Sequence, residues 1–83
     1  MEKVEIIEIV NNFLIEEFEL EAEDLTPDAH LMNDLEIESL DFVDIVVIIE
    51  KDFGFKVKNE DLTNLRTLDD LYNYIYNQKN AQA

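Results

Sequence analysis

The segment from Ser39 to Gly54 constrains the fold of this chain more than any other. Its residues from Phe42 to Ile49 are apolar except for Asp44, and apolar residues at helical spacing form one face: Phe42, Ile45, Val46, Ile49 and Phe53. Ser is a strong helix N-cap residue, and Gly commonly ends a helix. The sequence therefore predicts a helix that begins at Ser39 or Leu40, ends near Phe53 and buries this face in a core.

Two other segments have the apolar spacing of long helices. The first runs from about Val4 to Phe18, and its apolar stripe consists of Ile6, Ile9, Val10, Phe13 and Leu14. The second begins at Thr67, where Thr67-Leu68-Asp69-Asp70 resembles a capping box with Asp in place of Glu. Its buried stripe is expected to contain Leu68, Leu71, Tyr72 and Ile75.

A brief helical turn is expected from Glu60 to about Leu65, with Asn59 as its cap. The fold class predicted for these 83 residues is therefore all-α. We expect a small four-helix bundle with three longer helices, one short third helix and a long loop between the first two. Residues 1–78 are expected to form the single domain, and 79–83 to be a frayed C-terminal tail.

The long loop runs from about Glu19 to Glu38 and contains the only proline. Five of its apolar residues are expected to hold it against the core: Leu25, Leu31, Met32, Leu35 and Ile37. Its acidic residues suggest a calcium loop, but that motif needs a glycine in mid-loop, and the only glycine is Gly54. One imidazole cannot make a metal site alone, so we interpret His30 as an ordinary loop residue and predict no metal site.

The second helix has more apolar residues than one buried face requires. Leu40, Val43, Val47 and Ile48 fall on its other side, among Asp41, Asp44 and Lys51. A helix that is apolar all round is normally buried, but a domain this small can hardly surround one. We therefore favour a patch that faces a partner, with burial in the core as the competing interpretation.

The charge is strongly acidic and unevenly distributed. The net charge is -15, and fifteen of the 21 acidic residues lie between Val4 and Glu50, where no Lys or Arg occurs. Such a surface repels nucleic acid and anionic membranes and attracts basic patches on other proteins.

The chain has no cysteine, which excludes disulfides and thiolate metal sites. No apolar stretch reaches the roughly 18 to 20 residues needed to span a bilayer. The N-terminus lacks a signal-peptide pattern, so we expect a cytoplasmic protein.

Ser39 is surrounded by acidic residues in Asp34-Leu35-Glu36-Ile37-Glu38-Ser39-Leu40-Asp41. A serine nucleophile needs a base and an oxyanion hole, and neither His nor Cys stands beside this serine. We therefore interpret Ser39 as a residue that another protein modifies, and the chain as a carrier rather than an enzyme. The competing interpretation is that Ser39 is only a helix cap.

The segment Asp34 to Asp41 resembles the signature of the acyl carrier protein family, usually Asp-Leu-Gly-x-Asp-Ser-Leu-Asp. The resemblance continues into the last helix and covers nearly the whole chain in length and element order. Two residues depart from the pattern: Glu36 replaces the usual Gly, and Glu38 replaces the usual Asp before the serine.

The resemblance implies that Ser39 carries 4′-phosphopantetheine from coenzyme A, whose thiol holds acyl groups as thioesters. It implies a monomer whose partners are a phosphopantetheinyl transferase and acyl-transferring or condensing enzymes with basic patches. The expected docking residues are Glu38, Leu40, Asp41, Asp44 and Val47. An acyl chain would lie between the second and third helices, against Phe42, Val46, Ile49 and Leu62.

Two alternatives remain open from the sequence. The cargo belongs either to fatty-acid synthesis or to a specialised pathway that uses an aminoacyl, aryl or polyketide unit. The second alternative is that the chain is an acidic helical interaction module without a prosthetic group.

Overall fold

The computed structural model describes residues 2–81, apart from the side chains of Ser39, Asn59 and Ala81. The regular elements of the described part of the chain are helices, with no strand: α1 (Lys3–Phe18), the 3-10 turn η1 (Ala22–Asp24), α2 (Ser39–Phe53), α3 (Asn59–Thr63) and α4 (Leu68–Ala81). The predicted all-α class, with three longer helices, a short third helix and a long loop after the first, is confirmed.

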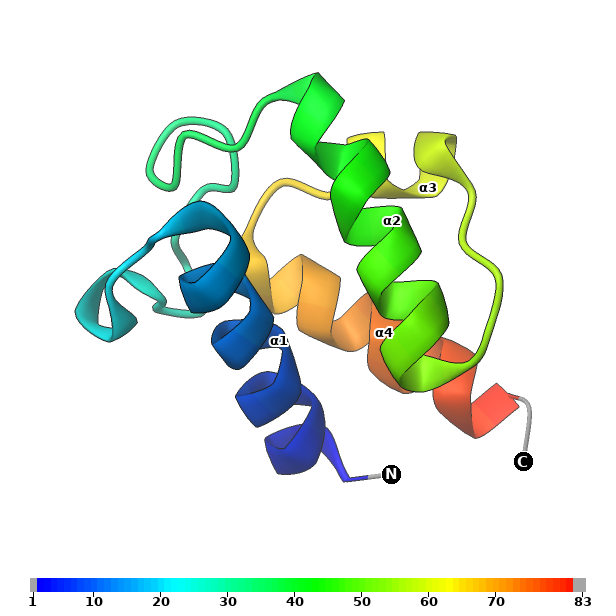
Figure 1. Ribbon diagram of the computed structural model, residues 1–83. Coiled ribbons are helices and arrows are strands. Elements are labelled where there is room, and N and C mark those ends of the chain that lie inside the picture. The colour runs from blue at the N-terminus through cyan, green and yellow to red at the C-terminus, as the bar shows by residue number, and fades with distance from the viewer. Residues whose placement is uncertain (1, 82–83) are drawn as a thin grey trace.

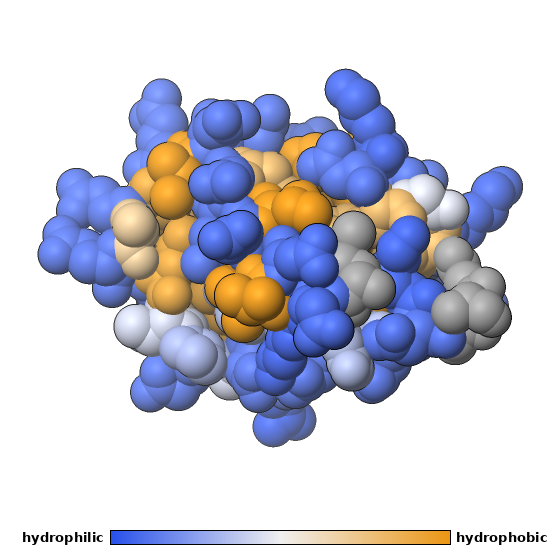
Figure 2. Space-filling view, turned by 90° about the horizontal axis from the view of Figure 1, so that it is seen from below, coloured by the Kyte–Doolittle hydropathy of each residue, from blue (hydrophilic) through white to orange (hydrophobic). Residues whose placement is uncertain are grey.

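The helices pack in two pairs, α1 against α4 and α2 against α3 (Figure 1). The predicted apolar stripes meet in one core, whose most deeply buried side chains include Ile6, Val10, Leu14, Ile45, Ile49, Leu62, Leu68, Leu71 and Ile75. Charged side chains cover much of the surface. Viewed from below, the molecule shows apolar side chains exposed between hydrophilic ones (Figure 2).

The loop from 19 to 38 is attached to the start of α4 by backbone hydrogen bonds. The amide of Leu31 donates to the carbonyl of Arg66 at 2.8 Å, and the amide of Leu68 donates to the carbonyl of Ala29 at 2.9 Å. The expected apolar anchors are buried, namely Leu25, Leu31, Leu35 and Ile37. Met32 is the exception: it is 49% exposed, because the loop turns outward after Leu31.

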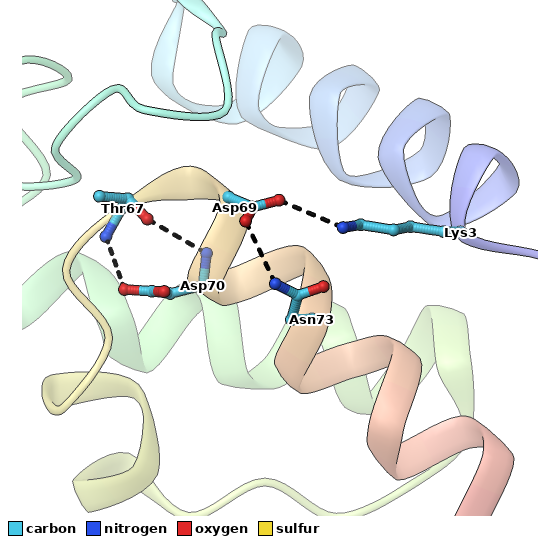
Figure 3. Close-up of polar contacts among 5 residues, drawn as sticks. All are labelled: Lys3, Thr67, Asp69, Asp70 and Asn73. Atoms are coloured by element: carbon cyan, nitrogen blue, oxygen red, sulfur yellow. Dashed lines mark hydrogen bonds and ion pairs between the residues drawn. The ribbon is translucent and has the colours of Figure 1, made fainter.

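The first turn of α4 confirms the predicted capping box. The amide of Asp70 donates to Thr67 Oγ1, and the amide of Thr67 donates to Asp70 Oδ2, each at 3.2 Å (Figure 3). The Asp70 carboxylate also accepts a hydrogen bond from the amide of Arg66 at 3.2 Å. The amides of Thr67 and Arg66 stabilise its charged form, so they lower the pKa of Asp70. The neighbouring Asp69 forms an ion pair with Lys3 on α1, at 3.2 Å.

Two helix boundaries differ from the sequence prediction. Helix α4 continues to Ala81, so residues 79–81 are helical rather than part of a frayed tail, and residues 82–83 lie outside the described part. Lys79 helps to hold this last turn, because its Nζ donates to the carbonyl of Phe53 at 2.8 Å. Asn59 is the first residue of α3, and Lys58 occupies its N-cap position.

Candidate functional site

Helix α2 begins at Ser39, whose predicted role as N-cap passes to Glu38. The amide of Glu38 donates to Asp41 Oδ2 at 3.0 Å, and the amide of Asp41 donates to the carbonyl of Glu38 at 2.9 Å. Asp41, which was expected to be a docking residue, thus also caps α2. The backbone of Ser39 stands between two exposed residues, Glu38 and Leu40, at the surface end of a rigid element.

One side of α2 exposes a ridge of three aliphatic residues. Leu40 is 79% exposed, Val43 49% and Val47 60%. Their spacing of three and four residues places them on one helix face, and the exposed Asp44 adjoins them. We call Leu40, Val43 and Val47 the apolar ridge.

The apolar ridge agrees with the sequence interpretation of surplus residues that face outward, with one correction. Ile48 is half-buried and packs against the core, so it does not belong to the ridge. Val43 does belong, although it was not among the expected docking residues. The sequence could have indicated this, because Val43 is three residues from Leu40 and four from Val47 and so lies on the same helix face.

The residues expected to line an acyl-chain pocket are part of the packed core. Phe42, Ile49 and Leu62 are at most 4% exposed, and Val46 packs partly buried against them. No pocket is found among the described residues. Phe42, Val46 and Ile49 lie on α2 and Leu62 lies on α3, which packs against α2. Their role toward an acyl chain stays a prediction.

His30 organises the loop that leads to α2. Its Nδ1 accepts hydrogen bonds from the amides of Met32 at 3.3 Å and Asn33 at 3.1 Å. Its own amide donates to Asp34 Oδ2 at 2.7 Å, and its carbonyl accepts from the amides of Asp34 and Leu35. The interpretation of His30 as an ordinary loop residue missed this role, because it depends on a fold of the backbone that no local pattern encodes.

Glu36 adopts a backbone conformation that favours glycine. Its φ is +56°, in the left-handed region, which costs a residue with a Cβ about 1 kcal/mol. Its neighbours Leu35 and Ile37 are buried, at 3% and 2% exposed, and the amide of Ile37 donates to the carbonyl of Leu31 at 2.9 Å. This backbone conformation could be suspected from the sequence, because Glu36 stands where the acyl carrier protein signature usually has Gly.

The described residues contain no group of three or more His, Cys, Asp or Glu side chains placed to hold a metal ion. Within the same part of the chain, no helix has the length and apolar character needed to cross a membrane.

Comparison with known proteins gives one matching family model and several relatives. The model describes a phosphopantetheine attachment site and matches residues 8–75. An acyl carrier protein of Coprothermobacter proteolyticus is 35% identical over 75 residues, which cover 90% of this chain and 92% of the relative.

Two further relatives are similar over nearly their whole length. An acyl carrier protein of Syntrophobacter fumaroxidans is 33% identical over 79 residues, covering 95% of this chain and 93% of the relative. One of Lactobacillus johnsonii is 30% identical over 80 residues, covering 96% of this chain and all of the relative.

Proposed function

Since the chain belongs to the acyl carrier protein family, we propose that Ser39 carries its prosthetic group and that the protein holds acyl groups as thioesters for fatty-acid or related biosynthetic enzymes. The cofactor of this family is a covalently attached 4′-phosphopantetheine. When bound, it supplies a terminal thiol on a flexible arm.

One observation carries the assignment of the attachment residue: Ser39 is the only serine in the chain. The family attaches its prosthetic group through a serine, and the matched model covers residues 8–75. The position suits the role. The backbone of Ser39 begins α2 between exposed neighbours, so a transferase can approach it, and a rigid helix then fixes the point of attachment.

The chain itself contributes recognition rather than catalysis. Family membership implies interaction with a phosphopantetheinyl transferase and with biosynthetic enzymes. We propose that they read the apolar ridge together with Glu38, Asp41 and Asp44, through basic patches of their own. The acidic surface steers such partners toward the carrier over long range.

Three further parts of the proposal follow the family. The carrier works as a monomer in the cytoplasm and has no enzymatic activity of its own. Residues 1–78 contain the carrier domain, with α4 extending to Ala81. The acyl chain shelters against Phe42, Val46, Ile49 and Leu62 when α2 and α3 separate to admit it.

An aminoacyl, aryl or polyketide cargo is the second candidate, motivated by Glu36 and Glu38 in place of the usual Gly and Asp.

Intact mass spectrometry tests the attachment residue. After incubation with coenzyme A and a phosphopantetheinyl transferase, the wild type should gain one phosphopantetheine and Ser39→Ala none. Thr63→Ala, which removes a hydroxyl exposed on α3, is the matched control and should be loaded like the wild type. Loading of Ser39→Ala, or no loading of the wild type by any transferase tried, contradicts the proposal.

A further inference from the structure

Glu36 is held in place by the loop around it rather than by its own side chain. The residues on either side are buried anchors, and the amides of Leu35 and Ile37 bind the carbonyls of His30 and Leu31 at 3.1 and 2.9 Å. Between these fixed points the chain must turn through a left-handed residue, and the side chain at that residue is directed to the surface.

The carboxylate of Glu36 makes no polar contact that would stabilise the fold within the described part of the chain. Its side chain is exposed, and within the described part of the chain the structure gives it no hydrogen bond and no ion pair. A glycine or an asparagine at this residue would adopt the left-handed conformation with less strain and without the charge. Backbone strain of this kind persists where the surrounding structure enforces it, and it is concentrated at functional sites.

Glu36 also lies close to the proposed attachment point. It stands three residues before Ser39 and two before Glu38, whose amide is bound to Asp41. The backbone at Glu36 is therefore held in place, and its exposed carboxylate lies three residues before the serine. An exposed carboxylate at a protein surface chiefly affects the rate at which a partner with a matching cation associates.

We propose that Glu36 is a specificity determinant for the phosphopantetheinyl transferase, read by a cationic side chain of that enzyme. The inference rests on the proposed attachment at Ser39 and adds the chemistry by which this carrier selects its transferase. On this proposal Glu36 has two opposing effects. Its carboxylate favours loading by the transferase, and its left-handed backbone lowers the stability of the fold.

Three substitutions separate charge from backbone conformation. Glu36→Gln keeps the size and the strain but removes the charge. Glu36→Asn and Glu36→Gly remove the charge and relieve the strain. Asp28→Asn removes an exposed carboxylate of the same loop at a residue more distant in sequence from Ser39, and it is the matched control for net charge.

The test measures melting temperature and the kcat/KM of loading, with coenzyme A and whichever bacterial transferase loads the wild type fastest in a panel. All three Glu36 variants should be loaded about two- to fivefold more slowly at low ionic strength, and the difference should disappear at about 1 M salt. Asp28→Asn should be loaded like the wild type. The Asn and Gly variants should melt about 2 to 5 °C higher than Glu36→Gln.

Loading of Glu36→Gln at the wild-type rate in low salt overturns the inference, as does an equal loss in Asp28→Asn, which would indicate net charge alone. Slower loading of only the Asn and Gly variants also overturns it, because the backbone would then be the cause. If no transferase loads the wild type, the proposed attachment fails and this inference fails with it. If the wild type is loaded and Glu36→Gln is unaffected, only this inference fails.

Discussion

Helices α2 and α4 are of similar length, but they use their side chains differently. On α4 the residues Leu68, Leu71, Tyr72 and Ile75 are at most 1% exposed, whereas α2 exposes the apolar ridge. Polar groups of α4 also bind the rest of the molecule. The Tyr72 hydroxyl donates to Asn11 on α1, and the Tyr74 hydroxyl donates to Asp61 Oδ2 on α3 at 3.1 Å.

This difference distinguishes residues that stabilise the fold from residues that stay exposed to solvent. Apolar surface stabilises a folded chain by about 25 cal/mol for each Å² removed from water, and the apolar ridge forgoes much of that gain. A small domain with a thin core has little stability to spare. The comparison therefore supports the proposal that partners dock on the exposed side of α2, whereas α4 mainly holds the bundle together.

The largest expected effect comes from truncating a buried residue of α4. Leu71→Ala should lower the free energy of unfolding by about 3 kcal/mol, through lost burial and the cavity left behind. Val47→Ala, on the apolar ridge, should change it by no more than about 0.5 kcal/mol. Urea unfolding of both variants measures the difference. Equal losses would mean that the ridge contributes to the fold as much as α4 does.

Alkaline pH should also act through α4. Burial raises the pKa of Tyr72 to about 12, and for Tyr74 burial and the hydrogen bond to Asp61 raise the pKa to about 12. In the unfolded chain both ionise near pH 10. Folding therefore keeps these tyrosines neutral, so their contribution is complete below pH 10 and is lost as pH rises through 10 to 12.

The melting temperature should accordingly fall steeply between pH 10 and 12. The double variant Tyr72→Phe/Tyr74→Phe should show a shallower fall than the wild type. Tyr76→Phe, which alters a more exposed tyrosine of the same helix, is the control. A double variant with the unchanged alkaline slope would show that these two hydroxyls are not responsible.

On α2, a charge placed on the apolar ridge should affect binding rather than folding. Val47→Asp should keep the helical circular dichroism signal, because the side chain stays in water, but should speed dissociation from the transferase about tenfold. Loss of the helical signal would instead place Val47 in the core.

Asp44→Lys tests the charged rim of the same surface. It should slow association several-fold at low salt and flatten its salt dependence. Asp44 serves this test better than Asp41, whose carboxylate caps α2 and whose loss would cost about 1 kcal/mol of stability. Surface plasmon resonance at several salt concentrations separates the two rates. An association rate unchanged by Asp44→Lys would remove this residue from the docking surface.

The smallest effect is expected from salt. Fifteen acidic residues without a base between Val4 and Glu50 repel one another in the compact state, and the Debye length falls to about 10 Å at 0.1 M. The melting temperature should rise modestly with sodium chloride, and at lower concentrations with magnesium or calcium if two carboxylates share one ion. A melting temperature that stays flat in all three salts would show that this repulsion is not a main cost.

Local patterns were sufficient to predict most of the helices. The apolar spacing around Ile6 and Ile49, the capping box at Thr67 and the stop at Gly54 each depend on residues within a few positions of one another. Local patterns were not sufficient to predict every helix boundary. Glu38 rather than Ser39 is the N-cap of α2, because the backbone is extended at Glu38 and becomes helical at Ser39. The helical end of α4 depends partly on Lys79 binding Phe53, 26 residues away.

By itself, then, the sequence determined the all-α class, the acidic surface and the candidacy of Ser39, because composition, helical periodicity and a short motif are properties of neighbouring residues. Only the tertiary structure decided which surplus apolar residues of α2 are exposed, that His30 organises the loop, and that Glu36 is held left-handed between buried neighbours. Burial is a property of the whole packed chain, and the loop that contains His30 and Glu36 is held by backbone hydrogen bonds to the start of α4.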